Sequence, residues 1–416
     1  MTRARPFDTL IVNCAAIATG DLNRPLADGD AIAIRQGTIE AIGKAGQFNR
    51  ETFDVVIDAV GTTAAPGLID PHVHPLLGDW HPRQAVFGWM ESALHGGVTS
   101  MLSQGIHMLP GRPKDAFSTK ALAILVGKTF HNHRPGGALK VHSCGVILEA
   151  GLREADFAEM AREGVLLVAE IGAGGIYGWD NIGEMLTWAR AAGMKVPIHF
   201  GAASIPGSRR IGAADVKLYQ PDVVAHVNGG PISAPVDDID EVIDHTAATI
   251  EVIHCGNLRT GLHAVQRLRD RGELARLIIG SDTPVGHGAI PLAIIKTVVQ
   301  LAPLAGLRGE IAIALATGNS ARAYGLTGVG ILEPGRVGDV ILIDRASGAD
   351  ANSALETIER GDLPAITSIV VDGQPITMRA RNTPFTERVP TYSGNGVTGL
   401  RYPSSFEQAM FPSLFA

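Results

Sequence analysis

The stretch Gly67-Leu68-Ile69-Asp70-Pro71-His72-Val73-His74 decides the fold of this chain, because it joins an apolar run to a His-x-His ending. Side chains alternate along a β-strand, so we expect the imidazoles of His72 and His74 on one face, where both can bind one metal ion. Further candidate ligands stand at or near the ends of other apolar runs, namely Glu170, His199, His226 and Asp282. This pattern predicts a metal-dependent hydrolase.

Short apolar runs recur through the middle of the chain, and the segments that join them have helical spacing. The predicted strands cover residues 67–74, 98–104, 139–147, 165–171, 196–201, 223–227, 249–255 and 277–282. Apolar residues at helical spacing with charged outer faces predict helices over 156–163, 181–192, 237–246 and 262–276. Strands that alternate with helices predict a parallel sheet, and eight such units predict a closed, TIM-like (β/α)8 barrel.

Both ends of the chain have a different pattern, in which short apolar segments alternate with Gly and Asp turns. These segments are 10–17, 31–35, 38–42, 55–60, 339–343 and 366–371. We therefore expect a small β-sandwich domain formed by residues 1–64 and 330–385, with the barrel, residues 65–329, inserted between its halves. Residues 386–416 are rich in Pro, Ser, Asn and Gly, which is typical of an arm or tail.

The composition of the chain limits the classes of binding partner that we expect. The chain has 416 residues, 35 Lys and Arg against 42 Asp and Glu, and a net charge of −7 without a basic block, so we expect no nucleic-acid partner. No apolar run approaches the ~18 to 20 residues of a membrane helix, so we expect no membrane partner. Three scattered cysteines favour a reducing cytoplasm. Apolar residues of the tail favour docking in a homo-oligomer, a dimer or a tetramer: Phe406, Met410, Phe411, Leu414 and Phe415.

The active site of such a barrel lies where the strands end, so residues far apart in sequence meet in one pocket. Four imidazoles and two carboxylates are enough to hold two divalent metal ions. A nitrogen and oxygen donor set without thiolate suits Zn(II), with Fe(II), Mn(II) or Co(II) as alternatives.

These ligands match, position by position, the metal-site pattern of the amidohydrolase superfamily, and within it the chain resembles the enamidases. Besides residues 67–74, the resemblance rests on segments 92–99, 110–116, 204–208, 226–231, 316–320 and 335–340. It implies that His72, His74 and Asp282 hold a buried ion, that His199 and His226 hold an outer ion, and that Glu170 bridges the two. Many relatives use a carboxylated lysine as the bridge, but no Lys occurs between Lys140 and Lys195.

The resemblance also implies the reaction. Enamidases cleave a C–N bond of a small cyclic amide, 6-oxo-1,4,5,6-tetrahydronicotinate. We therefore expect metal-activated hydroxide as the nucleophile, with Asp282 as general base and then general acid. Differences around the predicted pocket leave a bulkier or aromatic amide, an ester or lactone, or a carbamate as alternative substrates. A phosphoester hydrolase and a non-catalytic protein are the competing classes.

The substrate-binding residues are predicted from their positions in loops that follow barrel strands. Candidates to meet a small anionic ring are Arg112, Tyr177, Phe200 and Arg209. Other histidines are expected to line the pocket or to support the ligands: His107, His142, His254 and His287. The glycines of segment 172–175 are better explained by a tight turn than by a phosphate cradle, because the full glycine fingerprint is missing.

Overall fold

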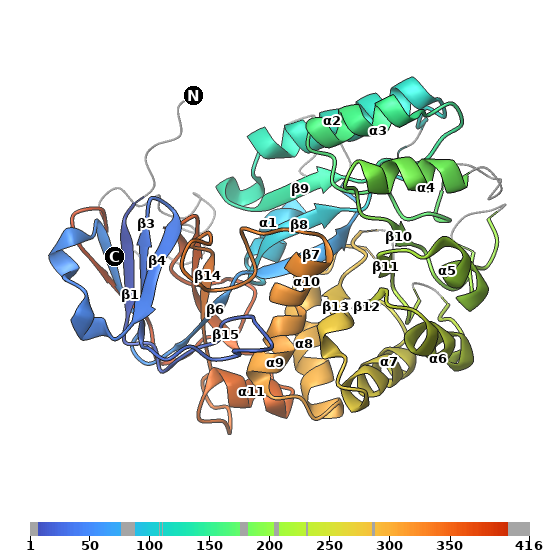
Figure 1. Ribbon diagram of the computed structural model, residues 1–416. Coiled ribbons are helices and arrows are strands. Elements are labelled where there is room, and N and C mark those ends of the chain that lie inside the picture. Colours follow the sequence, from blue (N-terminus) through green and yellow to red (C-terminus); the bar gives the residue numbers. More distant parts are fainter. Residues whose placement is uncertain are drawn as a thin grey trace.

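The computed structural model describes residues 7–75, 88–107, 109, 111–174, 182–203, 208–229, 232–284 and 288–397. These residues form a β-sandwich at one end of the molecule and an α/β barrel at the other (Figure 1). The predicted fold class is therefore confirmed. No helix in the described ranges is long and apolar enough to cross a membrane.

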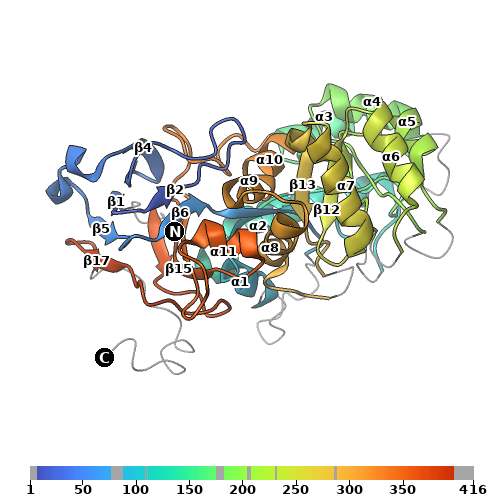
Figure 2. The ribbon, with the colours of Figure 1, turned by 90° about the horizontal axis from the view of Figure 1, so that it is seen from below.

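The sandwich consists of two five-stranded sheets, to which both ends of the chain contribute (Figure 2). The first sheet has the order β17 (Thr391–Ser393), β5 (Val55–Asp58), β1 (Thr9–Val12), β3 (Ala31–Arg35) and β4 (Thr38–Gly43). The second has the order β16 (Gln374–Thr377), β15 (Ala365–Val371), β14 (Val340–Asp344), β6 (Thr63–Pro66) and β2 (Ala16–Ile17). Val and Ile dominate the central strands, which suits a buried, pleated surface.

The predicted arm begins inside this sandwich. Within residues 386–416, the segment Thr391–Ser393 forms β17 and pairs antiparallel with β5. The Tyr392 hydroxyl donates to Ser368 Oγ at 2.8 Å, and Arg388 forms an ion pair with the buried Asp344. The start of the arm is thus part of the sandwich, whereas residues 398–416, with the apolar side chains expected to dock, lie outside the described residues. The domain boundaries given above stay predictions.

Parallel strands build the barrel wall. One side consists of β7 (Leu68–Val73), β8 (Val98–Ser103) and β9 (Lys140–Cys144), and the other of β10 (Pro197–Ile198), β11 (Val223–Val224), β12 (Thr249–Ile253) and β13 (Leu277–Gly280). The predicted strand 165–171 lies between them, joined by the isolated parallel bridges Val146–Val168 and Leu167–Lys195 instead of a regular ladder. A bridge between Val73 and Thr283 links the two ends of the wall.

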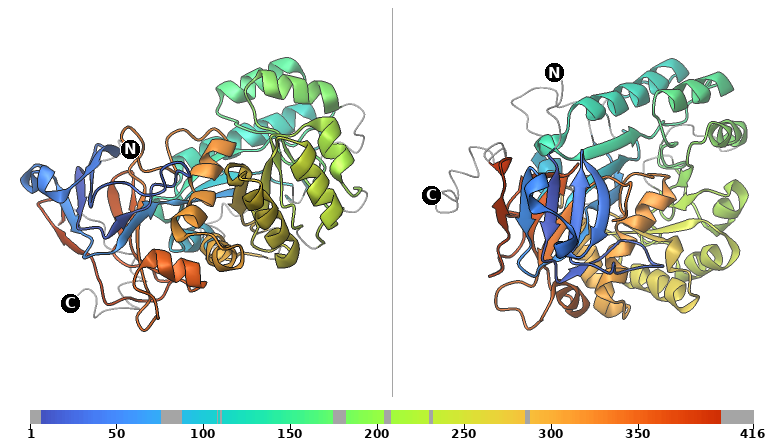
Figure 3. Two further views of the ribbon diagram at one scale, coloured as in Figure 1. Left: turned by 60° about the horizontal axis from the view of Figure 1, so that its bottom comes forward. Right: turned by 60° about the vertical axis from the view of Figure 1, so that its left-hand side comes forward.

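Helices surround these strands (Figure 3). They are α1 (Gly88–Leu94), α2 (Ala116–Asn132), α3 (Glu154–Arg162), α4 (Ile182–Ala191), α5 (Ala213–Tyr219), α6 (Val236–His245), α7 (Leu258–Asp270) and α8 (Ala293–Leu304). Three more follow: α9 (Gly309–Leu315), α10 (Gly318–Ala323) and α11 (Ala354–Arg360). Short 3-10 turns are η1 (Ala45–Gln47), η2 (Arg50–Thr52), η3 (Pro135–Gly137) and η5 (Leu274–Arg276). Predicted helix 262–276 thus begins earlier, where Asn257 caps α7, and ends earlier as well.

A β-bulge in β7 determines which side chains face the barrel interior. Ile69 packs with interior residues of other strands, whereas Leu68 and Val73 both belong to the core under the helices. In a regular strand, residues five positions apart would face opposite sides. A register shift between Asp70 and Val73, around Pro71, adds one residue to β7, so Leu68 and Val73 can face the same side. The bulge therefore turns the end of β7 so that its histidines point inward.

Candidate metal centre

The residues predicted as metal ligands come together at one end of the barrel. His72 lies in β7, His74 follows that strand, and the others lie in or after the segment 165–171, β10, β11 and β13. Their side chains are buried, namely those of His72, His74, Glu170, His199, His226 and Asp282. Convergence at the strand ends is the arrangement expected of a barrel active site.

Two groups of donor atoms share the Glu170 carboxylate. His72, His74 and Glu170 form one group, and Glu170, His199 and His226 form the other, with the ligand atoms of each group within 4.8 Å of one another. Glu170 Oε1 lies 2.9 Å from His226 Nε2 and 3.5 Å from His72 Nε2. A carboxylate shared in this way suggests a binuclear metal site.

Asp282 lies beside the first group. Its Oδ1 is 3.3 Å from His74 Nε2 and 3.6 Å from His72 Nε2. Both Asp282 and His226 have positive φ angles, of 58° and 34°. Residues other than glycine rarely adopt this backbone conformation, and such strain is concentrated at functional sites.

Hydrogen bonds on the far side of the rings prepare the first group for a cation. His74 Nδ1 donates to Gly105 O at 2.9 Å, because a carbonyl oxygen only accepts, and His72 Nδ1 donates to Glu251 Oε2 at 2.7 Å. The Nε2 atoms of His72 and His74 therefore face each other at 3.2 Å, each with a lone pair that can bind a cation. Burial lowers the pKa of His72, but Glu251 and Glu170 raise it well above its usual value. This gap attracts a proton or a metal ion.

The second group also presents a free nitrogen lone pair, that of His199. His199 Nε2 donates to Ala202 O at 2.8 Å, which leaves its Nδ1 without a proton. Burial lowers the pKa of His199 to about 4, so the ring is neutral at pH 7. His226 Nδ1 is buried without a hydrogen-bond partner in the described part of the chain. Both donor sets thus fit divalent metal ions.

Two buried carboxylates behind the ligands were not predicted. Glu251 lies in β12 and contacts His72, as described above. Asp70 Oδ1 accepts from the backbone N–H of His72 at 3.3 Å and of Ser281 at 3.1 Å, and burial raises the pKa of Asp70 to about 7. The available signal was an acidic residue inside an apolar strand, which is rarely buried without a partner.

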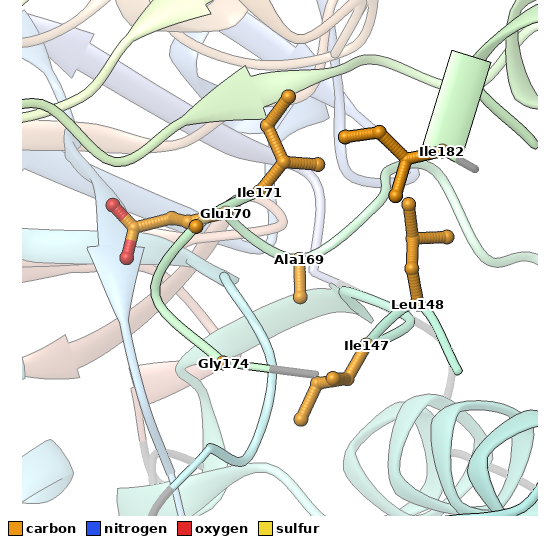
Figure 4. A pocket seen from close by; sticks show the side chains of 8 residues that line it. Ile147, Leu148, Ala169, Glu170, Ile171, Gly174 and Ile182 are labelled. Atoms are coloured by element: carbon orange, nitrogen blue, oxygen red, sulfur yellow. The ribbon is translucent and has the colours of Figure 1, made fainter. Parts of the chain in front are cut away.

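A pocket adjoins the Glu170 side of this centre (Figure 4). In Figure 4 the Glu170 side chain extends away from those of Leu148 and Ile182. The pocket is lined mainly by apolar and small residues, namely Ile147, Leu148, Ala169, Ile171, Gly172, Gly174 and Ile182. The space that they enclose, about 20 Å³, has room for about one water molecule.

The predicted substrate-binding residues have different surroundings. Arg112 is nearly buried, with its Nη1 2.7 Å from Glu149 Oε1. Phe200 is buried in the core next to His199, whereas Arg209 is half-exposed and forms an ion pair with Asp215. Tyr177 lies outside the described residues. These contacts do not test a role in substrate binding, and all four assignments stay predictions.

Of the additional histidines, His107 lies beside the metal ligands. Its ring centroid is 5.5 Å from that of His74, and both of its ring nitrogens are buried with no hydrogen-bond partner among the described residues. Burial and the nearby His74 lower the pKa of His107 to about 3. His142 bonds Ser100 and His254 bonds Thr297, while predicted His287 lies outside the described residues.

The sequence model of the amidohydrolase family matches residues 63–378, which include the barrel and part of the sandwich. The chain is a member of the amidohydrolase family. This amidohydrolase is 43% identical over 380 residues to the enamidase of Eubacterium barkeri, which covers 91% of this chain and 98% of that enzyme. A crystal structure of enamidase matches with a TM-score of 0.88 at 42% identity, covering 93% of this chain and 100% of the other.

The imidazolonepropionase of Geobacillus kaustophilus is a more distant relative of this amidohydrolase, 25% identical over 405 residues, covering 82% of this chain and 90% of that enzyme. The predicted family and the resemblance to enamidase are therefore confirmed. The chain is an enamidase-like amidohydrolase with two His/Glu clusters that could bind metal.

Proposed function

We propose that this amidohydrolase holds two divalent metal ions and hydrolyses a C–N bond of a small cyclic amide. The observation that carries the proposal is the pair of donor groups sharing Glu170, in a chain that is 43% identical to an enamidase over 91% of its length. Zn(II) suits these nitrogen and oxygen donors best, and Fe(II), Mn(II) or Co(II) would also be accepted.

Each of the six ligands is assigned to one of the two ions or to both. His72, His74 and Asp282 would hold one ion, His199 and His226 the other, and Glu170 both. When bound, the two ions would lower the pKa of a water molecule and polarise the scissile carbonyl group. The nearby donor groups and the buried imidazoles support this assignment.

Asp282 is proposed to move the proton. Burial raises the pKa of Asp282, but the hydrogen bond from His74 and the charges of His72 and His74 lower it below its usual value. The carboxylate is therefore ionised at neutral pH and can accept a proton from the attacking water. It then returns the proton to the leaving ring nitrogen, so that the C–N bond breaks and the ring opens.

The proposed substrate is a carboxylated six-membered cyclic enamide, 6-oxo-1,4,5,6-tetrahydronicotinate or a close analogue. The 43% identity to an enamidase supports this substrate, and Arg112, which is paired with Glu149, is the cation proposed for the carboxylate. His107, whose ring nitrogens have no hydrogen-bond partner among the described residues, is proposed to hydrogen-bond the substrate. A bulkier amide, a lactone or a carbamate is the alternative. A cytoplasmic homo-oligomer, a dimer or a tetramer, stays a prediction.

The test combines elemental analysis with a substrate panel. We expect about two divalent ions per chain and turnover of the cyclic enamide well above that of a lactone or a nitrophenyl phosphotriester. Glu170→Gln should lower metal content and activity by orders of magnitude, because a neutral amide bridges two cations poorly. Glu310→Gln, which changes a buried carboxylate in α9, is the control. Full activity with one ion, or an unaffected Glu170 variant, would contradict the binuclear centre.

A further inference from the structure

Glu251 is an acidic side chain at the centre of the barrel wall. It is fully buried, and its neighbours along β12, Ile250 and Val252, are apolar and buried too. An unpaired carboxylate in such a place would be strongly destabilising or would take up a proton. None of the six proposed ligands comes from β12, so the role of Glu251 must come from its contacts.

These contacts reach both donor groups. Glu251 Oε2 lies 2.7 Å from His72 Nδ1 and 3.1 Å from the backbone nitrogen of His226, which donates to it. His72 belongs to the first group and His226 to the second. A single oxygen atom therefore holds one imidazole ring of the first group and the main chain that carries a ligand of the second.

The neighbouring strand leaves room for this approach. A Cβ atom at Gly280, in β13, would lie 2.6 Å from Glu251 Oε1 and 3.0 Å from His72 Cβ. The first distance is shorter than real Cβ contacts allow, and the second is tighter than most of them. The glycine thus lets the carboxylate and the imidazole sit side by side against the strand.

We propose that Glu251 is a positioning residue that strengthens the binding of both metal ions, an inference that rests on the proposed binuclear centre. By accepting from His72 Nδ1, it fixes the tautomer in which His72 Nε2 is free to bind metal. By accepting from the His226 backbone, it fixes the strained turn that carries that ligand. Two divalent ions bring four positive charges against two negative charges from Glu170 and Asp282, and Glu251 adds a third negative charge nearby.

The test measures metal affinity instead of turnover. Apo protein is titrated with Zn(II) against a competing chelator, for the parent, Glu251→Gln and Glu251→Leu. Loss of a group that supports a metal ligand typically costs about 10- to 100-fold in affinity. We expect Glu251→Gln to weaken both binding steps by about this factor, because it keeps the shape and loses the charge, and Glu251→Leu to weaken them further.

Two comparisons make the result decisive. Glu310→Gln, the same change at another buried carboxylate, should leave both affinities unchanged. Gly280→Ala would crowd both Glu251 and the His72 side chain without changing charge, and it should also weaken both steps. If Glu251→Leu fails to fold, Glu251→Gln, which keeps the shape of the side chain, decides the question. Affinities of Glu251→Gln within about twofold of the parent, or loss at one step only, would overturn the proposal. Because no substrate is used, a wrong substrate assignment would leave this result untouched.

Discussion

The two donor groups have similar ligands but unequal support. His72 and His74 end a six-residue strand, and the far nitrogen of each ring is bonded to a buried acceptor from another segment. His199 and His226 follow strands of only two residues, and His199 is bonded to Ala202, three positions along the chain. Because bonds behind a ligand set its orientation, the first group should hold its ion more tightly. Ligand identity alone would not reveal this difference.

The largest expected effect is at Asp282, beside the first group. Asp282→Asn should lower kcat by ~10²- to 10⁴-fold, because an amide cannot take up and return the proton. The variant and the parent are compared at equal metal content and across pH on the cyclic enamide. A parental kcat with the parental pH profile would show that the proton moves elsewhere.

The unequal support can be tested by removing metal stepwise. His199→Ala should retain about one ion per chain after dialysis, whereas His74→Ala should retain well under one, because it loses the tighter ion and dialysis removes the weaker one. In the parent, we expect two chelation steps separated by about 10- to 100-fold in affinity. Elemental analysis after dialysis measures the first expectation and chelator competition the second. A single step, or equal losses in the two variants, would mean that the groups are equivalent.

Proton displacement should make metal binding depend on pH. Glu251 and Glu170 outweigh burial and raise the pKa of His72, so this ring keeps a proton at pH 7 in the absence of metal. An incoming ion must displace that proton, so affinity should rise with pH, by about tenfold per unit for each proton, until pH exceeds the pKa. His199, with its pKa lowered to about 4, should add nothing to this slope near pH 7. Calorimetry in buffers of different ionisation enthalpy counts the protons released.

The smallest expected effect concerns His107, next to the first group. His107→Phe should raise KM by up to about tenfold, which corresponds to one lost hydrogen bond of roughly 0.5–1.5 kcal/mol. Metal content should not change, because the ring is proposed to face the substrate. His107→Asn keeps hydrogen-bonding atoms and should be milder. Loss of an ion in either variant would instead make His107 a ligand.

The sequence was informative where chemistry follows from local pattern. The spacing of His72 and His74 predicted converging nitrogens, and the strand ends predicted the positions of Glu170 and Asp282. The bulge around Pro71 could not be predicted, because it depends on the register with β8. Segment 165–171 was expected to be a regular strand, but its pairing with both neighbours is reduced to isolated bridges.

Glu251 shows a different limit. Its place in an apolar run marked a strand correctly, but its partner His72 comes from the opposite end of the barrel sequence. One sequence does not show that these two residues are in contact, because the contact exists only when β7 lies beside β13 in the closed barrel. The same holds for Gly280. Only the folded structure shows that a side chain at this position would clash with Glu251.

The pairing of β6 with β14 has a consequence for biosynthesis. Pro66 precedes the barrel and pairs with Val340, which follows it, so the second sheet of the sandwich cannot be completed until the whole barrel has left the ribosome. β5 likewise waits for β17 near the end of the described chain. During translation, the edge of β6 that pairs with β14 and the edge of β5 that pairs with β17 are open to other chains until these later strands emerge.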